Sequence, residues 1–329
     1  MKALIPVAGT GTRLRPHTWT IPKALINVAG KTILGHIIDT LLDAGIDEFI
    51  FVTGHMGDRV RQWAEETYEI PMEWVIQKEM AGLGHAVLQA GNEFAGEPVF
   101  IVLGDTIFKA DIGSVLERGG NSLGVVEVDD PGRFGVVVVE GEKVVRLVEK
   151  PDQPISHLAI AGLYQITDSE LLLSCLERLV TGDIRTRGEY QLTDALAMML
   201  EGGSTFRTFS LEAWYDCGVP ATVLETNRAL LDASGGRAKE TGDKTIIIPP
   251  VHIGDEVELT GSVVGPHVTL GNGTAIRGSV VRNSIIGENC VVEGGVLDAS
   301  IIGDNCVVRG RPLSLNVGDS STIDSYEGD

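Results

Sequence analysis

The stretch that decides the fold is KALIPVAGTGTRLRP, which runs from Lys2 to Pro16. Its first part, Lys2–Val7, is a short apolar run of the kind that forms a buried strand. The run gives way at Ala8-Gly9 to a loop that is rich in glycine. A short strand that leads into a glycine loop is typical of an open α/β sheet, in which ligands bind beyond the carboxyl ends of the strands.

Beyond this loop, strand and helix patterns alternate up to residue 103. The expected helices repeat apolar residues every three to four positions, and the expected strands are short runs rich in β-branched and aromatic residues. In chain order they are the helix Ile33–Ala44, the strand Phe49–Thr53, the helix Asp58–Tyr68, the strand Glu73–Ile76, the helix His85–Phe94 and the strand Val99–Leu103. Because strands and helices alternate, we predict an open, mostly parallel, Rossmann-like α/β sheet.

The pattern changes from about Ser122 to Ile166, where strands follow one another with no room for helices between them. Three helical patterns come next, over Asp168–Val180, Glu189–Leu200 and Pro220–Leu231. The polar, glycine-rich residues after them are typical of a linker. We therefore predict a first domain over residues 1–232 and a linker over 233–244.

A repeat begins after the expected linker. Its aliphatic-glycine pairs recur every 16 or 17 residues, at Ile253-Gly254, Leu270-Gly271, Ile286-Gly287 and Ile302-Gly303. Between Thr245 and Arg311 there is no Phe, Trp, Tyr or Lys, which favours narrow stacked coils over a sandwich core. The pattern resembles the hexapeptide repeat of a left-handed parallel β-helix. We predict this β-helix over residues 245–311, with an acidic tail over 312–329.

Overall charge limits the possible partners. The chain of 329 residues carries a net charge of −20, which would repel a nucleic acid polymer. The opening apolar run is too short for a signal peptide, and no stretch approaches the roughly 18 apolar residues of a membrane span. None of the four cysteines forms a Cys-x-x-Cys pair, so a zinc site is not expected. We expect a cytoplasmic protein without nucleic acid polymers or membranes as partners.

Positive charge is concentrated at the start of this acidic chain. The first 38 residues contain no acidic residue and five basic ones, which are Lys2, Arg13, Arg15, Lys23 and Lys31. A glycine loop exposes backbone N–H groups to phosphate oxygens, and Arg and Lys add charged donors. This arrangement predicts a phosphate site. It is not a dinucleotide-binding loop, because Leu14 stands where that loop requires a third small residue, and a P-loop is not matched either.

A series of motifs along the whole chain resembles one family. These motifs are Gly9–Pro16 followed by Pro22-Lys23, then Leu103-Gly104-Asp105, Glu149-Lys150-Pro151, Ala161-Gly162-Leu163-Tyr164 and Trp214-Tyr215-Asp216-Cys217-Gly218. In this order they resemble the sugar-1-phosphate nucleotidyltransferases, also called nucleotide-sugar pyrophosphorylases. Within that family the chain is most similar to the long-form glucose-1-phosphate thymidylyltransferases, which carry a C-terminal left-handed β-helix.

The resemblance implies a set of site residues. The catalytic residues would be Arg13, Lys23, Asp105 and Lys150, and the ligands of a Mg²⁺ cofactor would be Asp105 and Asp216. The nucleotide-binding residues would be Ala8, Gly9, Gly11, Thr12, Arg13, Gln77 and Gly82. The sugar-phosphate-binding residues would be Leu103, Gly135, Glu149, Lys150 and Gly162. Mg²⁺ prefers one or two carboxylates together with substrate phosphates, which suits two aspartates.

The expected reaction moves a nucleotidyl group from a nucleoside triphosphate, dTTP or UTP, to a sugar 1-phosphate such as glucose 1-phosphate, and releases pyrophosphate. No general base is needed, because the second pKa of a phosphate monoester is about 6 and the attacking oxygen is already ionised. The sugar stays open, since Phe134 stands where the family commonly has Tyr, and the base stays open, since the segment Gly82–Val87 also resembles UDP-glucose pyrophosphorylases. We also expect a homo-oligomer. Two alternatives are a non-catalytic regulatory relative and an acyltransferase activity in the β-helix.

Overall fold

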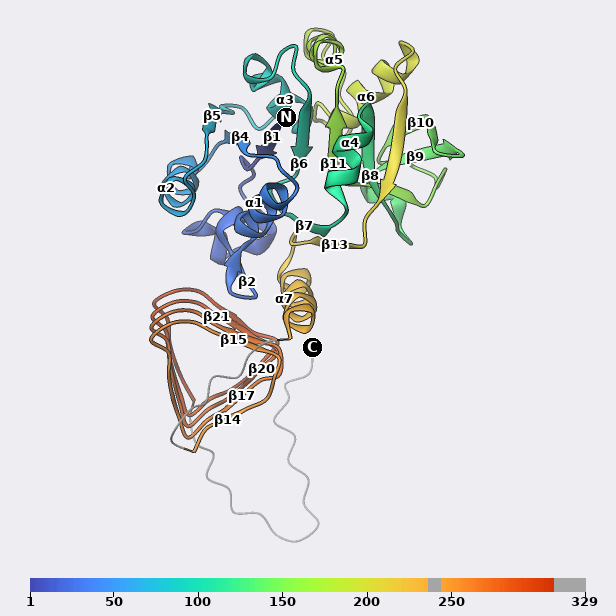
Figure 1. Cartoon of the computed structure of the whole chain (residues 1–329). Helices are drawn as coiled ribbons and strands as arrows, with labels where there is room; N and C mark the ends of the chain where they lie inside the picture. Colours follow the sequence, from blue (N-terminus) through green and yellow to red (C-terminus); the bar gives the residue numbers. More distant parts are fainter. Residues whose placement is uncertain (236–243, 311–329) are drawn as a thin grey trace. The chain divides into compact units, whose positions relative to one another are not determined.

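The computed structural model describes residues 1–235 and 244–310 and divides the chain into two compact units, Met1–Leu230 and Leu231–Asp329 (Figure 1). The division falls inside helix α7, which spans Pro220–Ser234. The predicted linker therefore starts within the last residues of a helix. Most of that linker, and the predicted tail over 312–329, lie outside the described residues.

The first unit is built on a mixed sheet. In spatial order its strands are β5 (Met72–Ile76), β4 (Glu48–Thr53), β1 (Lys2–Pro6), β6 (Val99–Val102), β11 (Leu158–Ile166), β8 (Asn121–Glu127), β12 (Phe206–Ser210), β10 (Lys143–Glu149) and β9 (Gly135–Glu140). The first four strands are parallel, and β8 and β12 are parallel to each other. Strands β11 and β10 run antiparallel to their neighbours. The prediction of an α/β sheet is confirmed, and parallel pairing is limited to the strands from β5 to β6 and to β8 with β12.

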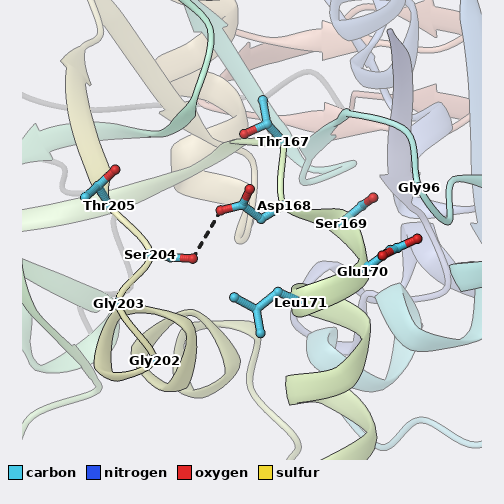
Figure 2. A pocket seen from close by; sticks show the side chains of 10 residues that line it. All are labelled: Gly96, Thr167, Asp168, Ser169, Glu170, Leu171, Gly202, Gly203, Ser204 and Thr205. Atoms are coloured by element: carbon cyan, nitrogen blue, oxygen red, sulfur yellow. Dashed lines mark hydrogen bonds between the residues drawn. The ribbon is translucent and has the colours of Figure 1, made fainter.

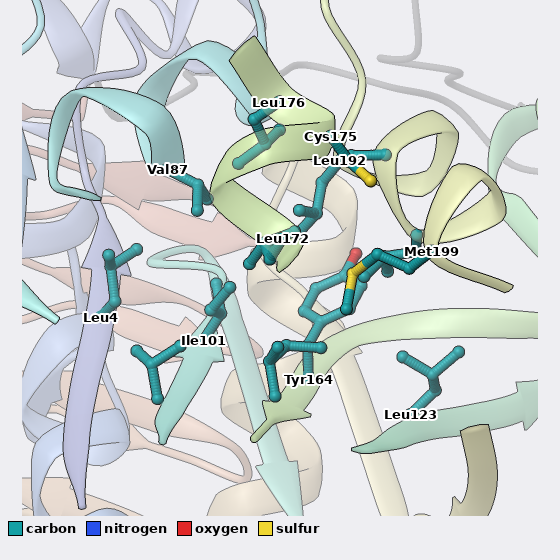
Figure 3. Close-up of a cluster of buried hydrophobic side chains, with 14 of the residues drawn as sticks. Leu4, Val87, Ile101, Leu123, Tyr164, Leu172, Cys175, Leu176, Leu192 and Met199 are labelled. Atoms are coloured by element: carbon teal, nitrogen blue, oxygen red, sulfur yellow. The ribbon is translucent and has the colours of Figure 1, made fainter. Parts of the chain in front are cut away.

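Helices cover the sheet because their apolar faces need a partner surface. They are α1 (Ile33–Asp43), α2 (Gly57–Thr67), α3 (Leu83–Gln89), α4 (Ile112–Arg118), α5 (Ser169–Thr181) and α6 (Leu192–Glu201). Side chains of α3, α5 and α6 pack on the sheet through residues such as Val87, Leu172 and Leu192, against Leu4 and Ile101 (Figure 3). Full burial of each such side chain contributes about 1.5–3 kcal/mol.

Two predicted helices begin or end elsewhere. The expected helix His85–Phe94 ends at Gln89 as an α-helix, and a 3₁₀ turn over Gly91–Glu93 follows it. The expected helix over Glu189–Leu200 begins only at Leu192, because Glu189 forms a β-bridge with Thr186 and Tyr190 N–H donates to a distant carbonyl. Tertiary hydrogen bonds therefore replace local helix formation in this second segment.

Over residues 244–310 the second unit contains three parallel sheets whose strands come from successive coils, drawn in orange in Figure 1. The first sheet consists of β14 (Ile246–Ile247), β17 (Val263–Val264), β20 (Val280–Arg282) and β23 (Val296–Asp298). The second consists of β15 (Val251–Ile253), β18 (Val268–Leu270), β21 (Ile285–Ile286) and β24 (Ile301–Ile302). The third consists of β16 (Glu258–Thr260), β19 (Ala275–Arg277), β22 (Val291–Glu293) and β25 (Val307–Arg309). The paired residues lie 16 or 17 positions apart, which is the period of the sequence repeat. The unit is a parallel β-helix.

The core of the β-helix is narrow and aliphatic. Inward side chains such as Val268, Ile286 and Cys290 are buried on one another. Residues at equivalent positions stack from coil to coil, so each coil buries the apolar edge of the next. Within the described residues, no helix of either unit is long and apolar enough to cross a membrane.

Candidate active site

The glycine loop after β1 is held in shape by side chains that follow it. Gly11 has φ +61°, and a Cβ there would lie 2.9 Å from Thr18 Cγ2 and 3.1 Å from Lys23 Cβ. The Thr18 hydroxyl donates to Gly11 O at 2.7 Å. Gly9 differs, because a Cβ there would have no neighbour within 4 Å. The loop is therefore tight where it meets Lys23 and open at Gly9.

Two further predicted nucleotide residues belong to this loop. Ala8 is buried, and its carbonyl oxygen would lie 3.0 Å from a Cβ placed on Gly54, which follows strand β4. Thr12 begins the 3₁₀ turn Thr12–Leu14, which also carries Arg13. Both residues lie at the carboxyl edge of the sheet, where ligands bind in open α/β folds.

Asp105 lies at the same edge, just after strand β6. Gly104 N–H donates to Pro6 O at 3.3 Å, so the segments after β6 and β1 are in contact. A Cβ on Gly104 would lie 2.5 Å from Val7 Cγ1, which only glycine avoids. The Asp105 carboxylate accepts from Lys23 Nζ at 2.5 Å. The structure therefore joins Asp105 to the glycine loop through Lys23.

Asp216 is brought to Asp105 by a separate ribbon. Strands β7 (Thr106–Lys109) and β13 (Ala213–Asp216) pair antiparallel, with Asp216 opposite Thr106. Cys217 N–H donates to Asp105 O at 3.1 Å. Two carboxylates that are 111 positions apart in the chain therefore lie on neighbouring backbones, as a shared metal site would require.

Opposite charges meet around these carboxylates. A Cβ on Gly218 would lie 2.9 Å from Asp216 Oδ1 and 3.2 Å from Arg13 Nη2, so Arg13 faces Asp216. Burial raises the pKa of Asp216, and the negative charge of Asp105 raises it further. The cations Lys23, Arg13 and Arg133 lower the same pKa. The site therefore holds two carboxylates that repel each other, and three cations that favour the charged form of Asp216.

Glu149 and Lys150 lie at and just after the end of strand β10. The Glu149 side chain is only 8% exposed, and Lys150 Nζ lies 3.3 Å from its Oε1. Lys150 has φ +43°, an uncommon conformation for a residue with a side chain, and its N–H donates to Phe134 O at 2.9 Å. A Cβ on Gly135 would lie 2.9 Å from Glu149 Oε2. Three predicted sugar-phosphate residues are therefore neighbours.

Leu103 and Gly162 form a second contact of the predicted sugar site. Leu103 N–H donates to Gly162 O at 3.0 Å. A Cβ on Gly162 would lie 2.7 Å from Leu103 Cδ1. The glycine is thus required by the packing of Leu103 as well as by any approach of a sugar.

Gln77 and Gly82 are also neighbours, but their contacts are largely internal. Gln77 is 4% exposed, and its Nε2 donates to Gly82 O at 3.2 Å and lies 3.1 Å from His85 Nδ1. A Cβ on Gly82 would lie 2.6 Å from Tyr190 O. His85, to which the sequence assigned no role, helps to orient the Gln77 amide.

Two charged residues of the site were missed in the sequence. The charge of Arg133 lowers the pKa of Asp216, although the sequence motifs pointed only to its neighbour Phe134. Asp194 lies in the first turn of α6 and is influenced by the charge of Lys150. The available signal for Asp194 was weak, because a single acid at the start of a predicted helix is ordinarily a helix-end residue.

A hollow of about 740 Å³ lies away from these residues (Figure 2). It includes Thr167, which follows β11, and β11 runs antiparallel to β6. The hollow is therefore at the sheet edge opposite Asp105. Its Asp168 carboxylate accepts from Asn121 Nδ2 at 2.8 Å and from Ser204 Oγ at 3.1 Å, so it is already hydrogen-bonded.

Comparisons with known proteins agree with this fold. A sequence model of the nucleotidyl transferase family matches residues 2–233. The low-salt glycan biosynthesis nucleotidyltransferase Agl11 of Haloferax volcanii is 30% identical, over 88% of this chain and 89% of the relative. The glucose-1-phosphate thymidylyltransferase of Streptomyces antibioticus is 30% identical, over 88% and 83%. The UTP–glucose-1-phosphate uridylyltransferase AglF of Haloferax volcanii is 33% identical, over 70% and 96%.

A solved structure shows the same fold. The crystal structure of a UDP-glucose pyrophosphorylase complexed with UDP-glucose is similar with a TM-score of 0.61 and 25% identity, and it covers 70% of this chain and 98% of its own. The chain belongs to the sugar-1-phosphate nucleotidyltransferase family and is a nucleotidyltransferase enzyme. The resemblance found in the motifs is confirmed.

Proposed function

We propose that this enzyme transfers a nucleotidyl group from dTTP or UTP to glucose 1-phosphate, which gives a nucleoside diphosphate glucose and pyrophosphate. The names of the similar thymidylyltransferase and uridylyltransferase support both nucleotides and the sugar. The observation that carries the proposal is the meeting of Asp105 and Asp216 with Lys23 and Arg13 at the ligand edge of the sheet.

Two carboxylates fit a Mg²⁺ ion that is completed by its substrate. Among the described residues no group of three or more His, Cys, Asp or Glu side chains could hold a metal, so an ion bound by Asp105 and Asp216 would need further ligands from its substrate. Mg²⁺ takes one or two carboxylates plus phosphate oxygens and waters. The raised pKa of Asp216, from burial and from Asp105, marks a pair that a divalent cation would neutralise. When bound, the ion supplies charge neutralisation at the phosphates.

The chain's own residues then position and neutralise two anions. Arg13 and Lys23, next to the open backbone at Gly9, would bind the triphosphate and stabilise the charge that builds on the departing pyrophosphate. Lys150 would bind the phosphate of the sugar, and Glu149 would accept hydrogen bonds from sugar hydroxyls. Because the sugar phosphate is already ionised, orientation is the main remaining requirement.

The β-helix has a supporting role in this proposal. We assign its short aliphatic coils to the left-handed hexapeptide class, and its role to self-association into a homo-oligomer in the cytoplasm. Removal of residues 245–329 should lower the oligomeric state or the melting temperature while pyrophosphate release continues. A truncated protein that remained equally assembled and equally stable would contradict this role. Acyl transfer to a sugar nucleotide by the isolated full-length protein would favour the alternative function.

The main experiment measures pyrophosphate release with Mg²⁺. The full chain is offered dTTP, UTP, ATP, CTP and GTP, each with glucose 1-phosphate and with other sugar 1-phosphates. We expect release with a pyrimidine nucleotide and glucose 1-phosphate. Failure to release pyrophosphate with every pair would instead support a non-catalytic relative. Preference for another sugar would correct the substrate while leaving the reaction class in place.

A further inference from the structure

Asp194 contains a buried oxygen without a hydrogen-bond partner. The residue lies in the first turn of α6, and its Oδ2 is removed from solvent and forms no hydrogen bond. A buried acceptor without a donor is costly and therefore uncommon in native proteins. Each such atom needs an explanation, for example a catalytic role or an ordered water or ion. Asp194 Oδ2 therefore needs a hydrogen-bond donor from its surroundings.

The first turn of α6 is packed against the predicted sugar-phosphate residues. A Cβ on Gly135 would lie 2.5 Å from Thr193 Oγ1 and 2.9 Å from Glu149 Oε2. Thr193 is the residue before Asp194, so the helix begins at the end of strand β10 that carries Glu149. The packing leaves no room for a side chain at position 135, which fixes the distance between helix and strand.

Lys150 is the cation that acts on Asp194. Burial raises the pKa of Asp194, and hydrogen bonding by the Thr186 side chain and the charge of Lys150 lower it. An ammonium group has three N–H donors. One acceptor is in place, because Glu149 Oε1 lies 3.3 Å from Lys150 Nζ. Asp194 Oδ2 lies beyond ion-pair distance of this ammonium, and a turn of the flexible Lys150 side chain would give it a second donor while the third stays open for a phosphate oxygen.

The backbone of Lys150 is also constrained. Its φ of +43° is a left-handed conformation that residues with a side chain rarely adopt. The hydrogen bond from its N–H to Phe134 O holds the residue there. Strained backbone at a site persists where the surroundings over-determine it, and it then serves to aim a side chain.

We propose that Asp194 is a positioning residue for Lys150, so that Glu149 and Asp194 hold the ammonium from two sides and present it to the phosphate of the sugar 1-phosphate. The proposal rests on the function stated above, because Lys150 is there the ligand of that phosphate. Asp194 itself need not touch the substrate. Its effect is therefore expected on the sugar substrate and not on the nucleoside triphosphate.

The test compares steady-state kinetics of the wild-type chain with those of Asp194→Asn and Asp194→Ala. Both variants should raise KM for glucose 1-phosphate about 10-fold, as loss of one charge-assisted contact would. KM for the nucleoside triphosphate should stay within about twofold of wild type. The alanine variant leaves no buried amide, so it keeps the test valid if the asparagine variant unfolds. The matched control is Glu170→Gln, since Glu170 is the first-turn acid of α5 and is exposed.

A second readout separates positioning from a structural role. The dissociation constant of the nucleoside diphosphate glucose product is measured by calorimetry for wild type, Asp194→Asn, Lys150→Gln and the double variant. We expect the effect of Asp194→Asn to be lost in the Lys150→Gln background, because Asp194 acts through Lys150. Equal effects in both backgrounds, or equal rises in both KM values, would overturn the proposal. A wild-type chain without activity would contradict the proposed function instead, so the two failures are distinct.

Discussion

The two units of the chain use polar side chains in opposite ways. In the β-helix, side chains bridge one coil to the next: Arg277 lies 3.0 Å from Glu258 and 3.2 Å from Glu293, and Glu293 also pairs with Arg309. Asp304 Oδ1 accepts from a backbone N–H of the preceding coil at 2.8 Å. Polar groups there satisfy one another, so they serve the stack itself.

The sheet edge of the first unit leaves its charges less well satisfied. Asp105 and Asp216 repel each other, and Asp194 has an acceptor without a donor. A sequence that folds well satisfies its local preferences nearly everywhere, and the exceptions collect at functional sites. Both regions contain acidic residues. The candidate site differs from the β-helix because some of its carboxylates repel each other or lack a hydrogen-bond donor.

The largest expected effect comes from removing a carboxylate of the pair. Asp105→Asn should lower kcat about 10²–10³-fold, because the charge that would hold Mg²⁺ is lost. Excess EDTA should abolish pyrophosphate release by the wild-type chain, and added Mg²⁺ should restore it.

The control for this variant comes from the β-helix. Asp298→Asn breaks an exposed pair with Arg282, in which Nη2 and Oδ2 are 2.9 Å apart. It should leave kcat unchanged and cost at most about 1 kcal/mol of stability. Parental turnover by Asp105→Asn would show that the metal assignment is wrong.

Substitution of two glycines can distinguish space reserved for a ligand from space filled by packing. Gly9→Ala adds a methyl group where there is no neighbour within 4 Å, so the melting temperature should not change. Because the methyl would enter the space assigned to phosphates, kcat/KM for the nucleoside triphosphate should fall about 10- to 100-fold. Unimpaired kinetics would move the triphosphate away from this loop.

The corresponding change in the β-helix should do the reverse. A Cβ on Gly271 would lie 2.6 Å from Gly287 C and 2.7 Å from Glu288 N, which are backbone atoms of the next coil. Gly271→Ala should therefore destabilise the second unit by about 1–3 kcal/mol, measured by chemical denaturation, with kcat preserved. A loss of turnover without a loss of stability would link the β-helix to catalysis.

A smaller effect is expected in the pH dependence of stability. Burial raises the pKa of Asp194 above its usual value of 3.8, and a hydrogen bond from Thr186 and the charge of Lys150 only partly offset that rise. The folded state then holds a proton that the unfolded state has released, so stability falls as pH rises through this window. Asparagine has no proton to release in this pH range, so Asp194→Asn does not show this loss of stability. Its melting temperature relative to wild type should therefore be higher at about pH 7 than at about pH 4, whereas Glu170→Gln should show no such trend.

The smallest effect concerns thiol labelling. Burial raises the pKa of Cys175 and Cys290, and it raises that of Cys217 to about 12. Cys306, which repeats the position of Cys290 one coil later, is partly exposed. A thiol reagent under native conditions should modify about one cysteine per chain rapidly. Cys306→Ser should remove that fast phase. A persistent fast phase would mean that one of the three buried cysteines becomes accessible to the reagent.

Much of the fold could be predicted because its signals are local. The apolar strand Val99–Leu103 and the period of the β-helix are both visible in the order of residues. The late start of α6 could not be predicted, because Tyr190 donates to Ala81 O across 109 positions instead of joining the helix. A hydrogen bond of that span leaves no trace in local periodicity.

The sequence by itself determined the repeat, the alternation of strands and helices, and the cationic start of the chain, since each depends on spacing or charge within a short window. The tertiary structure decided that Asp216 lies beside Asp105, that Arg13 faces Asp216 and that Asp194 lies within the field of Lys150. These pairings depend on which strand ends share an edge of the sheet. Strand order joins residues through space, and a linear pattern does not specify it.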